Sequence, residues 1–449
     1  MLATQSDPGI RHDLTEQLAD ARRQTDDVFA LVKPDSLYER PIAERHRIVF
    51  YIGHLEAFDW NLFHNRVLGL KAFHPEFDRL FAFGIDPVGG GLPSDQPSDW
   101  PSIAAVRGYV RKIREVLDEN LADALLDPHL PSFDGFPLTA LLHVAIEHRL
   151  MHAETLAYML HQLPLDRKVR QSESLIGPAS LVTHRSIEIP AGPVTLGLPR
   201  GSGLFGWDNE FEAHTVDVPA FAIDQYKVTN RQYLEFINAG GYDSRELWAD
   251  GSDHHEDWSW KSKQGISHPA FWRREGSQWL YRTMFDDVPL PLDWPVYVSQ
   301  AEAKAYARWA GKSLPSEAEW QRAAYATPHE GERIYPWGNA APAAEFGNFD
   351  FARWSPVPVN ALPAGRSAFG VDGMLGNGWE WTSTDFAPYP GFEPFPFYRG
   401  YSADFFDGKH FVMKGGSART ASCMLRRTFR NWFQAHYQFI YTGFRCVSR

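Results

Sequence analysis

The chain has 449 residues, of which 44% are hydrophobic and 22% charged, and its net charge is −12. One hydrophobic core rarely serves more than roughly 250–300 residues, so two or three domains are expected. The acidic balance, with no basic patch to offset it, argues against nucleic acid as a partner. Only Cys423 and Cys446 are present, which excludes a disulfide framework and predicts a reducing, cytoplasmic setting, and neither a signal peptide nor a membrane span is expected.

Four segments of the first part of the chain are predicted to be helices. Residues 13–32 place apolar side chains at helical spacing, and a second helix is expected to open at Pro41 and run to about residue 68. A third is predicted over 102–126, and a fourth over 138–163, which contains neither proline nor glycine. Four helices of these lengths predict an N-terminal four-helix bundle over residues 10–165.

Histidines on two of these helices form a candidate metal site. His148 and His152 are four residues apart, so their imidazoles lie on one helical face. His54 lies on or beside the apolar stripe of the second helix, and a buried histidine needs a hydrogen-bonding or metal partner. Because bundles carry metal ligands on facing helices, these three residues are the predicted ligands. Histidines at a common spacing without a metal remain the alternative at this point.

The second part of the chain differs from the first in composition and in its predicted secondary structure. Residues 166–185 are polar and predicted to be a linker, and 186–449 are rich in Gly, Pro and aromatic residues. We expect a loop-rich α+β domain held by large side chains there. Residues 187–197 are predicted to start a hairpin, and helices are predicted over 229–239 and over 299–310, the second with a capping box.

Short motifs in this second part resemble one known fold. They lie in order at residues 189–192, 207–210, 228–230, 295–299, 314–320, 376–382, 414–417 and 443–445. They resemble the formylglycine-generating-enzyme (sulfatase-modifying factor) fold, which is a C-type-lectin-like α+β domain. The first part resembles DinB-like bundles. Together the two resemble the non-haem iron sulfoxide synthases, which make the carbon–sulfur bond of ergothioneine and ovothiol, and a related branch that makes the carbon–selenium bond of selenoneine.

This resemblance implies a chemistry and a set of residues. The metal would be Fe(II), held by the three histidines, and the substrates would be O2 and hercynine, the trimethylated betaine of histidine. Tyr398 aligns with the family's catalytic tyrosine, with Tyr401 as the competing assignment. Trp432 and Asn431 match the family's substrate motif, and an aromatic face suits a quaternary ammonium group. Met151 replaces the family's glutamine between the ligand histidines, which puts one hercynine contact in doubt.

Two positions of the substrate motif bear on the second substrate. Phe433 and Tyr437 stand where enzymes that use γ-glutamylcysteine carry Asp and Arg, and no arginine lies between Arg79 and Arg107. A site without matching charges would bind that dipeptide poorly. The donor could then be free cysteine or a neutral selenosugar. Aromatic and uncharged polar groups suit the face of a sugar better than they suit an amino acid.

The sequence around the first histidine, residues 51–60, also looks more like the selenoneine branch. We therefore predict an enzyme that joins the imidazole C2 of hercynine to a selenosugar, with oxidation to the selenoxide. One alternative is an ergothioneine-type sulfoxide synthase that uses cysteine or another thiol. Another, from a different class, is a non-catalytic binding module with structural zinc.

Overall fold

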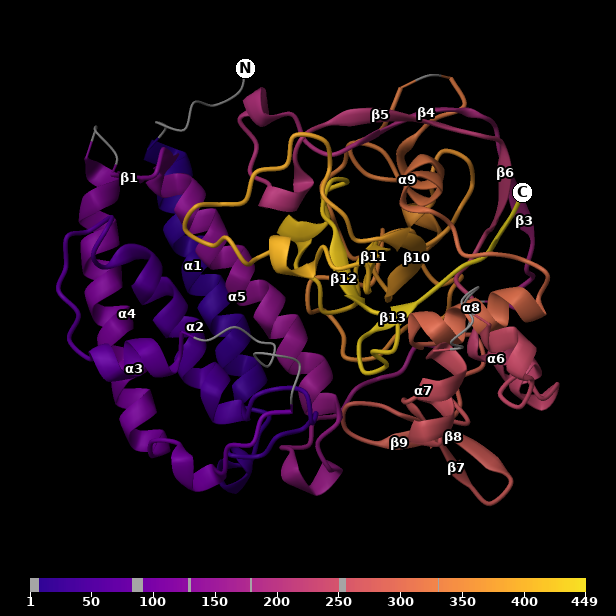
Figure 1. Ribbon diagram of the computed structural model, residues 1–449, viewed down its shortest axis with the longest axis horizontal. Helices are drawn as coiled ribbons and strands as arrows, with labels where there is room; N and C mark the ends of the chain where they lie inside the picture. Colours follow the sequence, from indigo (N-terminus) through magenta and orange to yellow (C-terminus); the bar gives the residue numbers. More distant parts are fainter. Residues whose placement is uncertain (1–7, 83–91, 128–130, 178–179, 250–255, 330) are drawn as a thin grey trace. The chain divides into compact units, whose positions relative to one another are not determined.

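The chain forms two compact units, Met1–Gln171 and Ser172–Arg449. The computed structural model describes residues 8–82, 92–127, 131–177, 180–249, 256–329 and 331–449 (Figure 1). The division falls inside the predicted linker, residues 166–185. Each unit has its own core and is described by itself.

The first unit is a four-helix bundle, as predicted (Figure 1). Helix α2 packs against α4 and α5, and α1 packs against α5 and α4. The elements are α1 (Pro8–Phe29), α2 (Ile48–Phe63), the short α3 (Pro75–Leu80), α4 (Ile103–Leu126), β1 (Ser132–Phe133), β2 (Phe136–Pro137) and α5 (Leu138–His161).

Several helix boundaries differ from the sequence-based prediction, and tertiary contacts explain two of them. Helix α2 begins at Ile48 rather than Pro41, because Arg47 is extended and its guanidinium donates to the Tyr38 carbonyl at 2.8 Å and the Asp95 carbonyl at 2.7 Å. These tertiary bonds hold the preceding backbone out of a helix. Helix α1 ends at Phe29 rather than residue 32, because Val32 forms an antiparallel bridge with Lys168.

The second unit contains several small sheets connected by long loops. Its largest sheet has the order β12-β11-β10-β13, and two three-stranded sheets have the orders β14-β6-β3 and β7-β8-β9. The strands are β3 (Ser186–Ile189), β4 (Gly192–Leu196), β5 (His214–Val218), β6 (Phe221–Asp224), β7 (Trp272–Glu275), β8 (Gln278–Arg282), β9 (Asp287–Pro289), β10 (Trp379–Asp385), β11 (His410–Lys414), β12 (Asn431–Gln434), β13 (Thr442–Gly443) and β14 (Val447–Ser448).

Residues 187–197, which were predicted to start a hairpin, form two strands that do not pair with each other. Strand β3 pairs with β6, and β4 pairs with β5, so the two strands belong to different sheets. The guanidinium of Arg322 donates to the carbonyls of Pro190 at 2.8 Å, Ala191 at 3.1 Å and Pro193 at 2.8 Å. These bonds replace the ladder that a hairpin would have formed at this corner.

Local capping starts three helices of this unit. A reciprocal capping box opens each one, as predicted for the helix after Ser299. The helices of the unit are α6 (Asn230–Asn238), α7 (Glu256–Gln264), α8 (Gln300–Trp309) and α9 (Glu317–Tyr325).

Large aromatic side chains fill the interior of the second unit, as the composition suggested. The fully buried indoles are those of Trp207, Trp248, Trp272, Trp294, Trp320 and Trp381. This α+β unit and the helical bundle confirm the predicted fold class.

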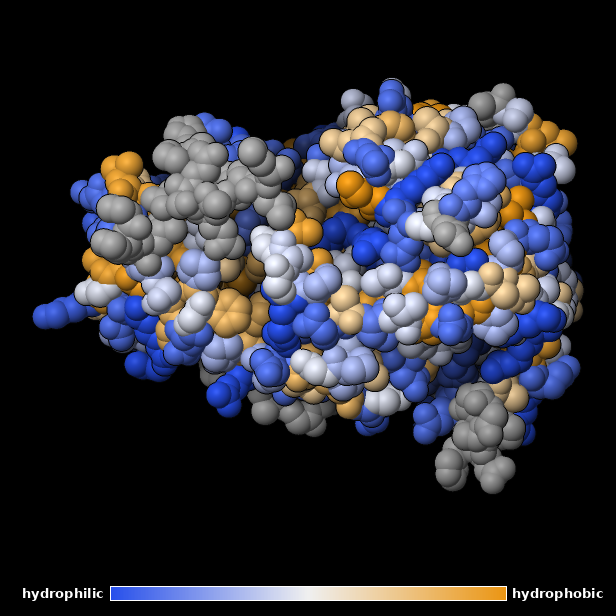
Figure 2. Space-filling model, turned by 90° about the horizontal axis from the view of Figure 1, so that it is seen from above, coloured by the Kyte–Doolittle hydropathy of each residue, from blue (hydrophilic) through white to orange (hydrophobic). Residues whose placement is uncertain are grey.

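The large hydrophobic side chains that are exposed among the described residues come from many parts of the chain. On the face seen in Figure 2, hydrophobic and hydrophilic residues are interspersed, which is ordinary for a protein surface. None of the helices in the described ranges combines the length and apolar character that crossing a bilayer requires. The large exposed hydrophobic residues include Leu92, Leu126, Leu181, Leu204 and Ile334.

Candidate metal centre

Three buried histidines meet in the core of the helical bundle. His54 comes from α2, and His148 and His152 come from successive turns of α5. Their ring centroids lie 5.4 Å (54 to 148), 4.9 Å (54 to 152) and 4.5 Å (148 to 152) apart. One nitrogen from each ring lies within 4.8 Å of the other two. The structure therefore brings the three predicted ligands together.

The backbone carbonyl of Phe81 orients the first histidine. His54 Nδ1 lies 2.7 Å from this oxygen, which can only accept, so Nδ1 carries the proton. The lone pair of His54 is then on Nε2, as in a metal-ligating histidine held by a second group. Gly53 makes the approach possible, because a Cβ at this position would lie 2.5 Å from Cδ1 of Phe81.

Aromatic side chains of α2 hold the histidine rings in place. Two of the contacts are stacked and one is tilted, so each ring has a fixed neighbour on the helix. The pairs are Phe50 with His54 (4.9 Å), Phe58 with His148 (3.5 Å) and Tyr51 with His152 (5.9 Å).

Burial keeps the three imidazoles neutral. It lowers the pKa of His54 to about 4. It also holds the pKa values of His148 and His152 well below the ordinary value, with the neighbouring histidines adding to the effect. Neutral imidazole is the form that binds a metal ion.

The donor set fits a transition-metal ion. His54 Nε2 and His152 Nδ1 are buried and have no hydrogen-bond partner among the residues that the structure describes. A buried polar atom without a partner is costly, and coordination to a cation would satisfy it. Three imidazoles are a common ligand set for such metals.

A buried cluster of charges flanks the histidines, and sequence reasoning missed it. The Arg149 guanidinium donates to both Glu56 carboxylate oxygens at 2.9 Å and to Asp59 Oδ2 at 2.7 Å. Burial raises the pKa of Glu56, but Arg149 and Arg114 outweigh it and hold that pKa at about 2. Charged residues inside otherwise apolar helices were the available signal, since such groups are rarely buried unpaired.

In the second unit, the predicted tyrosines and tryptophan form one aromatic cluster. Trp432 stacks on Phe386 at 4.1 Å and meets Tyr401 edge-on at 5.4 Å. Tyr401 stacks on Trp207 at 4.0 Å, and Tyr398 lies 5.4 Å from Tyr401. Tyr401 is buried and Tyr398 is half-buried.

The remaining predicted residues of this unit lie apart from that cluster. Side chains alternate along β12, so Asn431 and Phe433 point to the face opposite Trp432. The Phe433 ring lies 5.0 Å from Tyr437, and Asn431 Oδ1 accepts the backbone N–H of Trp432 at 2.8 Å. The structure thus divides the predicted substrate residues into two groups.

Met151 belongs to the helical unit. It lies on α5 between His148 and His152 and is half-buried.

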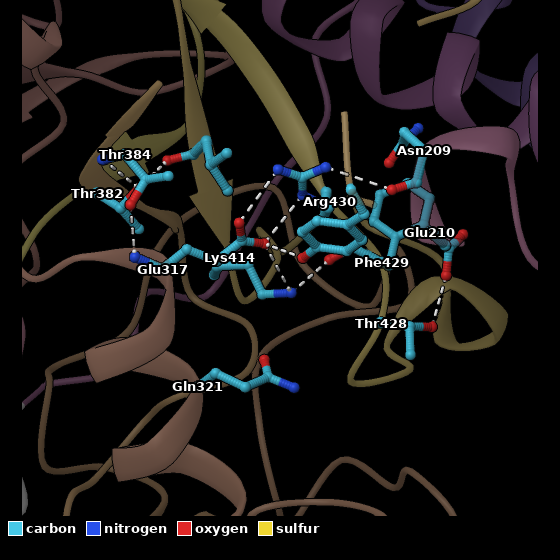
Figure 3. A network of polar contacts seen from close by, with 12 residues as sticks. Asn209, Glu210, Glu317, Gln321, Thr382, Thr384, Lys414, Thr428, Phe429 and Arg430 are labelled. Carbon is cyan, nitrogen blue, oxygen red and sulfur yellow. Dashed lines mark hydrogen bonds and ion pairs between the residues drawn. The ribbon is translucent and has the colours of Figure 1, made fainter. Parts of the chain in front are cut away.

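A buried polar network supports the start of β12. Figure 3 shows Glu317, Lys414 and Arg430 pointing toward one another. Arg430 bonds the Glu317 carboxylate at 3.0 and 3.2 Å, and Tyr389 donates to it at 2.9 Å. Lys414 donates to the Phe429 carbonyl at 2.8 Å, and burial lowers the pKa of Lys414 to about 8. Arg430 directly precedes Asn431, so this network fixes where the strand begins.

Comparisons with known proteins agree with this organisation. Residues 173–449 match the family of sulfatase-modifying factor enzyme 1-like domains, and residues 17–156 match the DinB superfamily. The chain is 35% identical to a hercynine oxygenase of Mycolicibacterium smegmatis, over 97% of this chain and 98% of that protein.

Two further relatives have related names. A hercynine oxygenase of Mycolicibacterium thermoresistibile is 39% identical over 67% of each chain. Ergothioneine biosynthesis protein 1 of Neurospora crassa is 28% identical over 93% of this chain and 55% of that protein. With its DinB-superfamily bundle followed by a sulfatase-modifying-factor unit, the chain belongs to the hercynine oxygenase family.

Proposed function

We propose that this protein is an O2-dependent Fe(II) enzyme that joins the imidazole C2 of hercynine to selenium from a selenosugar and oxidises the product to the selenoxide. The observation that carries the metal assignment is the meeting of three buried, neutral imidazoles from α2 and α5. Relatives named hercynine oxygenase support an oxygenase-type enzyme and hercynine as the acceptor. Cys423 and Cys446 form no disulfide in the part of the chain that the structure describes, which agrees with a cytoplasmic enzyme.

The uncharged character of the substrate motif supports a neutral donor. Phe433 and Tyr437 pack against each other at the positions where the γ-glutamylcysteine enzymes carry a charged pair. Aromatic rings offer a sugar an apolar face but offer a carboxylate no partner. No arginine lies between Arg79 and Arg107, so this segment offers no guanidinium to a carboxylate of the donor. Residues 83–91 of the segment lie outside the described structure.

A thiol donor is the second candidate. The names of the relatives, hercynine oxygenase and ergothioneine biosynthesis protein 1, favour a sulfoxide synthase that uses cysteine or another thiol. Sulfur and selenium donors would place the same demand on the histidines and on the hercynine contacts. The two candidates therefore differ in the donor site alone.

Each proposed residue has a defined task. Fe(II) held by His54, His148 and His152 would supply the redox chemistry with O2. The face of Trp432 would bind the quaternary ammonium of hercynine, which has no N–H to donate. Tyr398 would donate a proton or a hydrogen atom, with Tyr401 as the competing donor.

Product analysis separates the donors. The Fe(II) protein is incubated in air with hercynine and a selenosugar, cysteine or γ-glutamylcysteine, and the products are identified by mass. We expect the selenoxide product with the selenosugar. Turnover with cysteine but not with the selenosugar would establish the thiol reading instead. Tightly held zinc without O2 consumption would support a non-catalytic module.

Removing a histidine tests the metal assignment. We expect His148→Ala and His152→Ala each to abolish iron binding, because two imidazoles leave the ion without its third protein ligand. Iron content after anaerobic loading is the measurement. His161→Ala removes another buried histidine of α5 outside the cluster and is the control. Full iron occupancy in either ligand variant would refute the assignment.

Replacing the tyrosines tests the proton donor. We expect Tyr398→Phe to slow or redirect oxidation while iron content stays that of wild type, because the phenol is removed and the ring is kept. Tyr401→Phe is the matched variant, three residues along the same loop. If Tyr398→Phe leaves rate and products unchanged while Tyr401→Phe alters them, the role belongs to Tyr401.

A further inference from the structure

Buried ion pairs join the two helices that carry the histidines. Arg149 of α5 contacts Glu56 and Asp59 of α2, and these three side chains are at most 1% exposed. Arg149 Nη2 also donates to the carbonyl of Leu55 at 3.1 Å. One guanidinium therefore binds three groups of the facing helix.

The same pairing extends to the other two helices. Arg114 of α4 donates to Glu56 Oε1 at 2.9 Å and to both oxygens of Asp26 of α1 at 2.7 and 2.8 Å. The charges thus form a chain from α1 through α4 and α2 to α5. All four helices of the bundle have a member in it.

Stability alone does not explain this cluster. Removing charges from water is expensive, and well-packed apolar residues often serve a bundle equally well. Apolar contacts, however, specify the alignment of two helices less sharply, because repacked apolar cores lose uniqueness before they lose stability. A bidentate guanidinium–carboxylate pair accepts one geometry, so it fixes both the rotation and the height of α5 against α2.

The residues that form these ion pairs are direct sequence neighbours of the histidines. Arg149 directly follows His148 and is one turn from His152, and the carbonyl that it binds belongs to Leu55, which follows His54. A rotation of α5 that separated Arg149 from Glu56 would also turn both histidines away from His54. The ion pairs and the histidine cluster therefore share one helix register.

We propose that Arg149 is a positioning residue for the three-histidine centre. Its bonds to Glu56, Asp59 and the Leu55 carbonyl hold α5 and α2 in the register at which three nitrogens bind one ion. The inference rests on the proposed function in one respect, that the histidines bind a metal.

The test compares two arginine-to-lysine variants with Co(II) as the only ligand. Arg149→Lys retains the positive charge but cannot span both carboxylates. We expect Co(II) affinity to fall roughly 10–100-fold, as for other groups that orient metal ligands, and the visible absorption of bound Co(II) to change.

The matched control is Arg445→Lys. Arg445 forms a bidentate pair with Glu380 at 2.6 and 2.8 Å in the second unit, and both side chains are fully buried. We expect this variant to lower the unfolding temperature and to leave Co(II) affinity and absorption unchanged. The comparison therefore separates a general loss of protein stability from a displacement of the metal-binding histidines.

The outcomes are distinct. Unchanged Co(II) affinity and absorption in Arg149→Lys, with wild type binding one Co(II), would overturn this inference alone. Wild type that binds no Co(II) would overturn the proposed function and this inference with it. If Arg149→Lys does not fold, Glu56→Gln keeps the shape of the partner but replaces one accepting oxygen by an amide group that cannot accept, so the bidentate pair with Arg149 is lost. The same shifts are expected, and their absence would overturn the proposal.

Discussion

At the scale of single residues, Gly53 links packing to the orientation of a proposed ligand. The carbonyl of Phe81 fixes the tautomer of His54, and the Phe81 ring lies where a side chain at position 53 would be. In a helix interior, glycine normally costs stability relative to alanine. Here the absence of a side chain is required, because three ring carbons of Phe81 would lie within 2.6 Å of a Cβ.

Gly53→Ala is expected to destabilise the protein by about 1–3 kcal/mol, as overpacking does, and to weaken metal binding by displacing the Phe81 carbonyl. Thermal unfolding and Co(II) titration measure the two effects. Gly108→Ala in α4 is the control, because its new methyl group meets no atom within 4 Å. That change should stabilise the protein by about 0.5–1 kcal/mol. Equal behaviour of the two variants would contradict the argument.

Asp208 gives a pH dependence at the same scale. Burial raises the pKa of this carboxyl from 3.8 to about 6, although Ser402 donates a hydrogen bond to it. The folded state therefore holds a proton that the unfolded state releases earlier. The stability of wild type should fall as pH rises between these two values.

The Asp208→Asn variant stays neutral and should lack this loss. The difference in unfolding free energy between variant and wild type should grow across that pH range by up to about 3 kcal/mol. Denaturant titrations of both proteins at several pH values measure it. A constant difference would show that the pKa of Asp208 is the same in the folded and unfolded states.

At the scale of the elements, helix α8 depends on its capping box. The Ser299 hydroxyl donates to the buried Glu302 carboxylate at 2.7 Å and accepts the Glu302 N–H at 3.3 Å. Ser299→Ala should cost about 1–2 kcal/mol of stability, because it removes the cap and a donor to a buried carboxylate. Ser102→Ala at the exposed start of α4 should cost less. Similar losses at both sites would contradict this ranking.

Local signals explain which elements could be predicted from the sequence. Helical periodicity gave the four-helix bundle, and the Ser299 to Glu302 spacing gave the start of α8. The start of α2 was mispredicted because Arg47 makes its bonds to residues distant in sequence. The hairpin start over 187–197 was mispredicted because Arg322, which is distant in sequence, donates to the carbonyls of Pro190 and Ala191 between the two strands.

The same reasoning applies to the candidate site. The histidines could be found because they repeat on one face of a helix, and residues of the substrate motif because they resemble a family. The pairing of Arg149 with Glu56 and Asp59 could not be predicted, because a charged residue in a sequence does not indicate which residue it pairs with in the fold. That Trp432 and Phe433 point to opposite faces follows from β12, a strand that the sequence reasoning did not predict.

At the scale of the whole molecule, the two units should respond differently to metal. A ligand that binds only the folded state stabilises it by about 2.7 kcal/mol at 100 times its dissociation constant. Trp60 and Trp100 are in the first unit, and the other tryptophans of the 16 are in the second. The long helices lie in the first unit, so far-ultraviolet circular dichroism reports mainly the helical bundle. Most tryptophans lie in the second unit, so tryptophan fluorescence reports mainly that unit.

Adding Co(II) should raise the unfolding midpoint seen by circular dichroism and leave that seen by fluorescence nearly unchanged. Chelation should reverse the first shift. The His148→Ala protein is the control and should show neither change. A shift of the fluorescence midpoint alone would place the ion in the second unit instead.

The interleaving of His148, Arg149 and His152 also limits how this gene can change in length. An α-helix turns by about 100° per residue, so one codon inserted between positions 148 and 152 would swing the later imidazole out of its cluster. Additions to surface connections, by comparison, carry little penalty. Across the lineage, we expect insertions and deletions to accumulate outside this turn and to be absent within it.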